Sequence, residues 1–210
     1  MGSTNQGSGF VVHAKGFVTT NYHVIDGVGR ITVTFKNGED YIVGWYEHLN
    51  TNTNISLLRI APVSGDQPLK ALPLLQPPKN GFNFFAFSPL LIDFTFIPSN
   101  VSAYRTFYDM QKPDSTVHGG NCVQHTAVIP KGRSGGPLVN RAGQVMATNT
   151  IYVSAAGNSN FGALSGDLQL LQNRRTSLLK VSAVSVPNLT PLPSERWYRQ
   201  PAATELTEAA

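Results

Sequence analysis

Three observations in the 210-residue sequence predict an all-β fold. The 19 glycines and 14 prolines favour tight turns between short segments. Runs of β-branched and aromatic residues alternate with those turns at the spacing typical of barrels and sandwiches. No long helical period interrupts this series before a single helix candidate near the end of the chain. A β-barrel or β-sandwich is therefore expected.

The expected strands follow one another from the N-terminus. Residues 9–13 (GFVVH) and 16–20 (GFVTT) flank the hairpin-like turn AKG. The segment 31–35 (ITVTF) alternates apolar and polar residues and leads through the turn KNGED to a further strand. The strands expected after that turn are residues 41–47, 54–60, 82–87, 101–105, 123–129, 136–140 and 144–153.

The helix candidate covers residues 165–181, where leucines recur at near-helical spacing. These are Leu168, Leu171, Leu178 and Leu179, and Ser165 or Asp167 is placed to cap the helix. Residues 183–210 are rich in proline and then polar, which is typical of a linker or disordered tail. We therefore expect one domain over residues 1–182, with the tail leading to a further domain or ending free.

Composition narrows the classes of function. The net charge of +4 comes from scattered basic residues, which argues against nucleic-acid binding. The single cysteine, Cys122, excludes an internal disulfide and argues against a cysteine-based metal site, and we expect neither metal nor organic cofactor. The sequence has no run of 18 apolar residues, so no membrane association is expected. The N-terminus has no signal-peptide pattern, which favours a cytoplasmic location if Met1 is the native start.

The strongest chemical pattern is KGRSGGPLVN at residues 131–140. Small residues around Ser134 allow a sharp turn that exposes its hydroxyl and directs the N–H groups of Gly132 and Ser134 toward one point. Two N–H groups directed in this way can stabilise an oxyanion. An ordinary glycine-rich turn between strands would also fit the letters SGG alone.

The order of residues along the chain limits the catalytic class. GRSGG also fits the nucleophile elbow of α/β-hydrolases, but that fold needs a histidine after the serine. The five histidines are His13, His23, His48, His118 and His125, and all precede Ser134. No aspartate precedes His23, so His23 cannot act in the subtilisin order. The order histidine, acid, serine remains, as in chymotrypsin.

Residues 16–27 (GFVTTNYHVIDG) place His23 just after a strand and a polar turn. This segment resembles the histidine region of trypsin-like serine peptidases of the HtrA/Deg type. The resemblance continues through ITVTFKNGEDYIVG, NISLLRI, SNVSAYR and GRSGGPLVNRAGQVMATNT, and covers most of residues 8–170. It implies two β-barrels with the site between them, His23 as general base and Ser134 as nucleophile. Gly132 and Ser134 would form the oxyanion hole.

The position that the family gives to the triad acid holds Asn54, the first residue of NISLLRI. The acid accepts a hydrogen bond from histidine Nδ1 and stabilises the imidazolium that forms. An amide can accept through its oxygen or donate through its nitrogen, and donation favours the wrong tautomer. We therefore expect reduced activity.

Three interpretations of Asn54 stay open. It can be a substitution in an otherwise active peptidase, which we favour slightly. It can be native, with Asp26, Asp40, Asp66 or Asp93 supplying the charge. Finally, the domain can be a catalytically silent module that binds peptides. The intact His23, Ser134 and glycine-rich turn favour a weakened peptidase over a decayed one.

The other histidines and Cys122 have structural interpretations. We expect His13 and His48 at the surface or at strand edges, and His118 and His125 in structural roles. Because Ser134 occupies the nucleophile position, Cys122 is expected to be a small buried apolar residue.

Two further features concern regulation and specificity. Arg133 stands where zymogen-activated trypsins carry an aspartate, so activation by N-terminal cleavage is not expected. A ligand, a regulatory partner or a further domain would then control the site. Val128 and Ile129 at the base of the first pocket predict an apolar substrate side chain. Residues 148–153, with Thr150 and Tyr152, are expected to lie beside the substrate backbone.

The sequence therefore predicts a serine endopeptidase with a chymotrypsin-like double β-barrel and a C-terminal helix. It would act on protein or peptide substrates through an acyl-enzyme.

Overall fold

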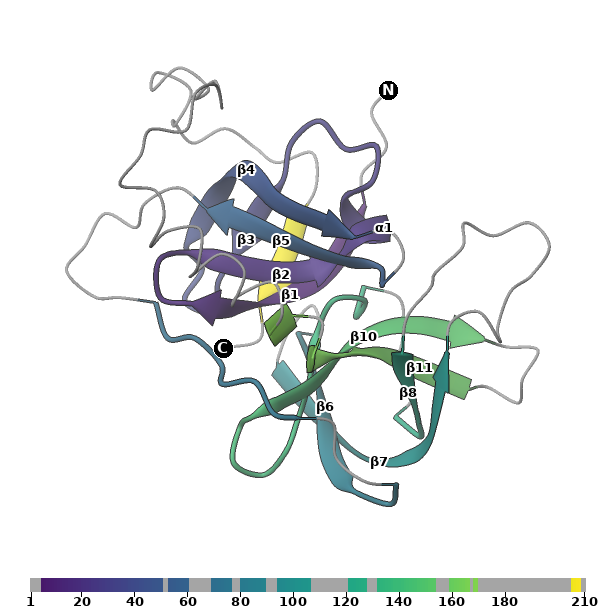
Figure 1. Ribbon diagram of the computed structural model, residues 1–210. Helices are drawn as coiled ribbons and strands as arrows, with labels where there is room; N and C mark the ends of the chain where they lie inside the picture. The colour runs from purple at the N-terminus through teal and green to yellow at the C-terminus, as the bar shows by residue number, and fades with distance from the viewer. Residues whose placement is uncertain are drawn as a thin grey trace, which may run out of the picture.

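The computed structural model describes residues 5–50, 53–60, 69–76, 80–89, 94–106, 121–127, 132–153, 159–166, 168–169 and 205–208. These residues form two closed β-barrels that lie side by side (Figure 1). The predicted all-β double barrel is therefore confirmed.

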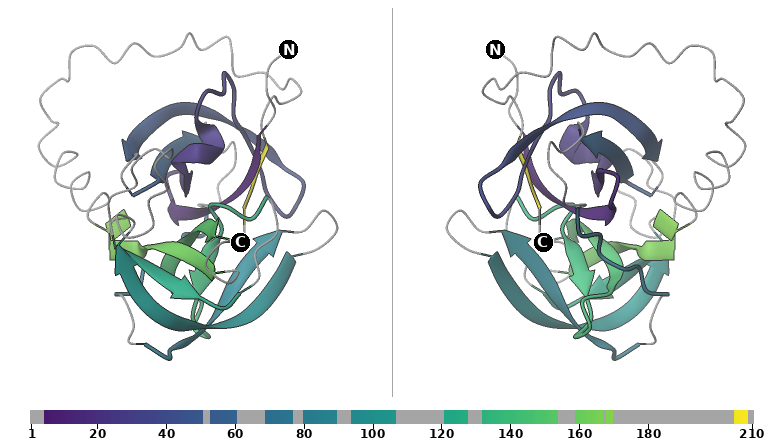
Figure 2. Two further views of the ribbon diagram at one scale, coloured as in Figure 1. Left: turned by 90° about the vertical axis from the view of Figure 1, so that its right-hand side faces the viewer. Right: turned by 90° about the vertical axis from the view of Figure 1, so that its left-hand side faces the viewer.

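The first barrel has the strand order β1-β12-β3-β4-β5-β2. Its elements are β1 (Gln6–His13), β2 (Phe17–Asn21), the short helix α1 (Tyr22–Ile25), β3 (Thr32–Thr34), β4 (Asp40–Asn50), β5 (Ile55–Ile60) and β12 (Glu205–Glu208). β1 and β2 form the predicted hairpin, and β5 pairs antiparallel with both β2 and β4. The C-terminal strand β12 lies between β1 and β3 and runs parallel to both (Figure 2).

The second barrel has the strand order β10-β11-β8-β7-β6-β9, and every pairing in it is antiparallel. Its strands are β6 (Asn83–Pro89), β7 (Phe94–Thr106), β8 (Asn121–His125), β9 (Pro137–Val139), β10 (Val145–Val153) and β11 (Ser159–Leu164). The glycine-rich turn immediately precedes β9, so the second barrel supplies the predicted nucleophile.

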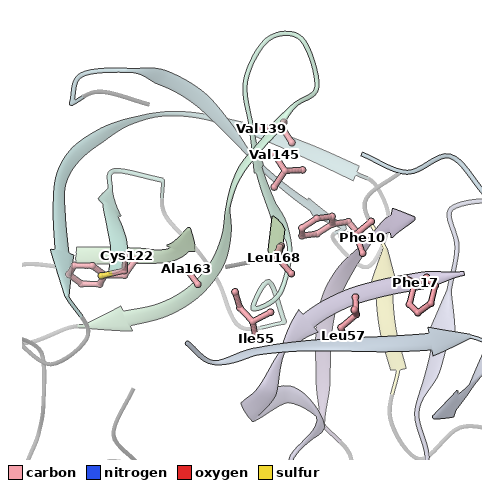
Figure 3. Packing of buried hydrophobic residues seen from close by; sticks show 11 residues of the cluster. Phe10, Phe17, Ile55, Leu57, Cys122, Val139, Val145, Ala163 and Leu168 are labelled. Carbon is pink, nitrogen blue, oxygen red and sulfur yellow. The ribbon is translucent and has the colours of Figure 1, made fainter. Parts of the chain in front are cut away.

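Alternation along the first-barrel strands explains why they are buried on both faces. On β1, Val11 packs inside the first barrel, whereas Phe10 and Val12 belong to a cluster that continues into the second barrel. Leu58 and Leu57 of β5 divide in the same way. The shared cluster also contains Val139, Val145 and Leu168 (Figure 3). Because strand side chains alternate with a period of two, one set fills the barrel and the other joins the two barrels.

The segment of residues 69–76 ties the barrels together. The Leu72 N–H donates to the Val11 carbonyl of β1 over 2.9 Å. Leu75 N–H donates to the Val145 carbonyl of β10 over 2.7 Å, and Val145 N–H donates to the Pro73 carbonyl over 2.8 Å. The connection between the barrels is therefore itself hydrogen-bonded to both.

Two parts of the chain differ from the sequence prediction or extend it. β11 was not predicted, because SNFGAL carries a glycine and polar residues instead of a β-branched run. Within residues 165–181, the structure describes residues 165, 166, 168 and 169, which are helical, and Leu168 is buried. The rest of that predicted helix lies outside the described residues. In the expected tail, residues 205–208 form β12 and are part of a sheet.

Candidate active site

Ser134 lies half-buried in the glycine-rich turn before β9. Gly132 has φ +87° and Gly135 has φ +95°, a region that favours glycine. No described residue accepts a hydrogen bond from the Gly132 or Ser134 N–H. The turn therefore has the sharp backbone predicted for it, and its two N–H groups are not used within the described chain.

Three consecutive carbonyl groups of this turn are held by hydrogen bonds. The Ser8 hydroxyl donates to the Gly132 carbonyl, and the Ser8 N–H donates to the Ser134 carbonyl, each over 2.8 Å. The Arg133 carbonyl accepts from Asn149 Nδ2 over 3.0 Å and from the Gly136 N–H over 3.2 Å. Ser8 belongs to β1, so the first barrel fixes the backbone of a turn that belongs to the second.

His23 lies in α1, two residues after β2 ends, and its side chain is exposed. Thr20 at the end of β2 donates its hydroxyl to the Ser8 carbonyl over 2.7 Å. The Ser8 N–H in turn contacts the Ser134 carbonyl. The strand that leads into His23 is thus joined through Ser8 to the nucleophile turn, which brings the two predicted residues to the same junction between the barrels.

Asn54 contacts His23 twice. Its Oδ1 accepts the His23 backbone N–H over 3.0 Å, and its Nδ2 lies 2.7 Å from His23 Nδ1. A backbone N–H can only donate, so the amide oxygen must face it and the NH2 group must face the ring. Nδ1 then has to accept, which places the proton of the neutral ring on Nε2. This is the tautomer that cannot accept a proton from a serine hydroxyl at Nε2.

The backbone around Asn54 fixes this side chain in place. Asn54 is fully buried and is the one described non-glycine residue with positive φ, at 54°. Asparagine and aspartate tolerate this region better than other residues. The Asn54 carbonyl accepts the Tyr22 N–H over 3.1 Å and Asn21 Nδ2 over 2.9 Å. The turn before β5 is therefore bonded to the residues on either side of the step from β2 to α1.

The described carboxylates proposed as substitutes for a triad acid are engaged elsewhere. Asp26 is exposed and accepts the Tyr22 hydroxyl over 2.9 Å, a bond that raises the pKa of Tyr22. Asp40 is also exposed and accepts the Thr34 hydroxyl over 2.7 Å. Asp66 and Asp93 lie outside the described residues. The group in contact with His23 Nδ1 is the Asn54 amide, at 2.7 Å.

β10 has an edge that extends past its neighbour. It pairs with β9 only at Val145, Ala147 and Thr148, whereas its pairing with β11 continues to Val153. From Thr150 onward, no described strand pairs with the β9 side of β10. Thr150 itself is buried, and its hydroxyl accepts Asn21 Nδ2 over 3.1 Å. Such an edge can receive an extended peptide as a further strand.

The remaining predicted pocket residues are placed only in part. Tyr152 lies on β10, and the contribution of its side chain stays a prediction. Val128 and Ile129 lie outside the described residues, so the apolar first pocket also stays a prediction. Arg133 is 6% exposed, and burial lowers the pKa of its guanidinium.

His125 and Cys122 are buried in the second barrel, as expected for structural residues. Cys122 is fully buried, and its thiol donates to the Arg105 carbonyl. His125 is 2% exposed and packs edge-on to Phe84 with ring centroids 5.6 Å apart. Burial lowers its pKa to about 4, against a smaller raising effect of the Asn149 side chain. His13 is exposed, as expected, whereas His118 lies outside the described residues.

The described residues contain no group of three or more potential metal ligands among His, Cys, Asp and Glu. No helix among them is long and apolar enough to cross a membrane.

Two closed barrels, joined at a serine in a glycine-rich turn, are the architecture of the chymotrypsin-like serine peptidases. The family model for the trypsin-like peptidase domain matches residues 7–147. The mitochondrial serine protease HTRA2 of Bos taurus is 34% identical over 155 residues, which are 72% of this chain and 32% of that protein. The serine protease Do-like HtrB of Bacillus subtilis is 32% identical over 171 residues, which are 76% of this chain and 36% of that protein.

A solved structure, the HtrA-type protease AlgW with a decapeptide, superposes with a TM-score of 0.65 at 25% identity. The match covers 80% of this chain and 50% of that one. The chain therefore belongs to the trypsin-like peptidase family, as the resemblance of its motifs implied. It spans less than half the length of these curated relatives.

Sequence reasoning did not identify the residues that hold the turn. Ser8, Asn149 and Asn21 each hydrogen-bond to the site backbone, yet none belongs to a catalytic motif. One signal was available for Ser8, because it lies between two glycines in GSG near the start of β1. Glycines on both sides of a polar residue often mark close backbone approach.

Proposed function

We propose that this chain is a serine endopeptidase domain in which Asn54 slows hydrolysis. Ser134 Oγ attacks the peptide carbonyl carbon, and its proton passes to His23 Nε2. The Gly132 and Ser134 N–H groups hold the oxyanion. When the C–N bond breaks, the proton passes to the amine that leaves, and water then hydrolyses the serine ester.

The observation that carries the proposal is the contact of Asn54 with His23. The geometry is built for a group that accepts twice, from the His23 backbone N–H and from the ring Nδ1–H. An amide can meet only one of these demands. To place the proton on Nδ1, the Asn54 side chain must turn its NH2 group toward the His23 backbone N–H, donor against donor.

The contact between Asn54 and His23 also sets the expected loss in kcat. Replacement of the acid by an amide costs about 10⁴ in kcat in a chymotrypsin-type site, which is ~5.5 kcal/mol of barrier. The intact turn and its unused N–H groups support residual activity. Substrates would be protein segments in extended form that pair with β10 beyond Thr148, with Thr150, Tyr152, Val128 and Ile129 near the first pocket. A regulatory partner or a further domain would act on this site.

A catalytically silent peptide-binding module is the second candidate. The orientation of the Asn54 amide favours it, because the resting ring would carry a donor at Nε2 where a base is needed. The β10 edge supports peptide binding in either case.

A fluorophosphonate probe, which labels activated serines, separates the two. We expect slow labelling of the parent chain, none of Ser134→Ala, and fast labelling of Asn54→Asp. Labelling that is equal in the parent and in Ser134→Ala would contradict the assignment of the nucleophile. If Asn54→Asp folds and still fails to react, the silent binding module is the better interpretation.

A further inference from the structure

The direction of the Ser134 N–H depends on the peptide unit that joins Arg133 to Ser134. A trans peptide is planar, with its C=O and N–H pointing in opposite directions. Whatever holds the Arg133 carbonyl therefore also directs the Ser134 N–H. In the described part of the chain no group accepts a hydrogen bond from this N–H, which leaves it able to donate to a bound oxygen.

Two described groups donate hydrogen bonds to the Arg133 carbonyl. The Gly136 N–H does so over 3.2 Å and Asn149 Nδ2 over 3.0 Å. The bond from Gly136 joins two residues of the same turn, so it would move with the turn. Asn149 belongs to β10, so its bond fixes the carbonyl relative to the second barrel. Of the two bonds, the one from Asn149 therefore decides how this peptide is oriented against the barrel.

The Asn149 side chain is 4% exposed, and its contacts favour the role of a donor. A carbonyl can only accept, so the NH2 group must face Arg133. Asn149 Oδ1 is buried, and no described residue makes a well-formed hydrogen bond with it. A buried acceptor without a partner costs free energy that an apolar side chain of similar size would not. The described contacts thus give this amide one use, which is to hold the Arg133 carbonyl.

The backbone of Asn149 is fixed against the turn independently of its side chain. Its carbonyl accepts the Gly135 N–H and its N–H donates to the Gly136 carbonyl, each over 2.8 Å. The pairing of β10 with β11 also shifts register between Asn149 and Ile151, and such an irregularity can redirect a side chain. A substitution at this position can therefore remove the amide while both backbone bonds stay in place.

From these contacts we infer that Asn149 is a positioning residue for the oxyanion hole, acting on the Arg133–Ser134 peptide. Without the amide, this peptide can rotate about its two flanking bonds while the rest of the turn stays bonded. Rotation would turn the Ser134 N–H away and bring the Arg133 carbonyl oxygen toward the developing negative charge. The inference rests on the proposed function, because it requires Ser134 as the nucleophile.

Binding of a peptide aldehyde tests the inference without turnover. The Ser134 oxygen bonds to the aldehyde carbon as the C=O π bond opens, and the hydroxyl proton passes to the aldehyde oxygen. The product is a hemiacetal whose oxygen lies in the hole. The matching peptide alcohol binds the same cleft without forming this bond. The measured quantity is the ratio of the alcohol to the aldehyde dissociation constant, with the full chain and one pair of peptides ending in valine.

We expect Asn149→Leu to lower this ratio about tenfold or more, because a lost oxyanion-hole donor costs about 10²–10³ in kcat in a comparable site. The alcohol dissociation constant should change by less than about threefold, since the alcohol places no oxyanion-like oxygen in the hole. A loss confined to the aldehyde is what a misdirected donor produces, whereas a general loosening of the cleft would weaken both ligands.

Asn140→Leu is the matched control. Asn140 directly follows β9 at the end away from Ser134, and its Oδ1 accepts the Ala142 and Gln144 N–H groups, each over 2.9 Å. This variant also removes an asparagine that holds the backbone of a turn in the second barrel. We expect it to lower the free energy of unfolding and to leave the ratio of dissociation constants at the value of the parent.

Several outcomes would overturn the inference. One is a folded Asn149→Leu protein with an unchanged ratio, whether both affinities are kept or both fall equally. Another is the same fall of the ratio in Asn140→Leu. If Asn149→Leu does not fold, Asn149→Ala removes the donor without adding volume, and the same ratio decides. A parent chain that binds the aldehyde no tighter than the alcohol instead contradicts the proposed nucleophile, which separates that failure from this one.

Discussion

The two barrels contribute unequal halves to one site. The second barrel supplies a glycine-rich turn in which the carbonyls of Gly132, Arg133 and Ser134 are all held by hydrogen bonds. The first barrel supplies His23, whose ring faces an amide donor at Nδ1. The half proposed to stabilise the oxyanion is therefore held at three consecutive carbonyls, whereas the histidine proposed to move the proton has an amide donor at Nδ1.

The barrels also differ in how they close. All six pairings of the second barrel are antiparallel. The first barrel closes through β12, which runs parallel to β1 and β3 and comes from the far end of the chain. Parallel pairing is slightly less stable per residue than antiparallel pairing. The second barrel is thus closed by antiparallel pairs alone, whereas the first is closed by a parallel strand from far along the chain.

The largest expected effect is the repair of the first-barrel half. Asn54→Asp should raise kcat/KM for a peptide substrate by about 10³–10⁴, because a carboxylate can accept both His23 hydrogen bonds. Steady-state hydrolysis of a chromogenic peptide measures this rise. Asn21→Asp, at a buried amide that contacts Asn54 only through its backbone carbonyl, is the matched control and should bring no gain. A gain below tenfold in Asn54→Asp would mean that the site lacks more than the carboxylate.

The second effect concerns the contact between the barrels. A Cβ at Gly135 would lie closer than 3.0 Å to the Ser8 carbonyl and the Thr20 hydroxyl, at φ +95°. Gly135→Ala should lower the free energy of unfolding by about 4 kcal/mol, from overpacking and backbone strain together. Gly143→Ala, with φ +74° and no atom within 4 Å of its Cβ, should cost about 1 kcal/mol. Urea denaturation gives both values. Equal losses would show that the backbone around Ser8 and Thr20 can shift to accommodate the added methyl group at little cost.

The third effect is a dependence of second-barrel stability on pH. Burial lowers the pKa of His125 from 6.5 to about 4, so the unfolded chain binds the proton first. The stabilising contribution of neutral His125 should therefore be fully present above pH 6.5. The free energy of unfolding should fall as the pH drops from 6.5 toward 4. The His125 share of that fall is about 3 kcal/mol at most. Denaturant titrations at several pH values should show a shallower fall of the free energy of unfolding in His125→Gln than in the parent. Identical slopes against pH in the two proteins would exclude His125 as the source of the fall.

The smallest effect tests the closure of the first barrel. Deletion of residues 205–210 removes β12 and leaves the facing edges of β1 and β3 unpaired. We expect a loss of about 1–2 kcal/mol and faster amide exchange in β1 and β3, since the lost hydrogen bonds contribute about 1 kcal/mol net each and the conformational entropy that the freed residues regain offsets most of their sum. Deletion of residues 209–210 alone is the control. Unchanged exchange in β1 and β3 would indicate that β12 adds nothing to the barrel.

The features of the fold and site that the sequence predicts are those that depend on neighbouring residues. Those that depend on contacts between residues distant in the sequence could not be predicted. The strands from β1 to β10 and the positions of Ser134, His23 and Asn54 are local patterns, and the sequence predicts them. The direction of the Asn54 amide depends on the His23 backbone N–H, 31 residues away, so the sequence left both orientations open. Ser8 and Asn149 act on the turn only after folding, across 124 and 16 residues. β12 escaped prediction because its partners, β1 and β3, lie at the other end of the chain.

Through Ser8, the conformation of the glycine-rich turn depends on the position of β1. The side chain and the backbone N–H of Ser8 hold the Gly132 and Ser134 carbonyls, on either side of Arg133. Any change that separates β1 from the turn would release two carbonyls of the turn at once. The conformation of the turn that carries Ser134 thus depends on a strand that lies more than a hundred residues earlier in the chain.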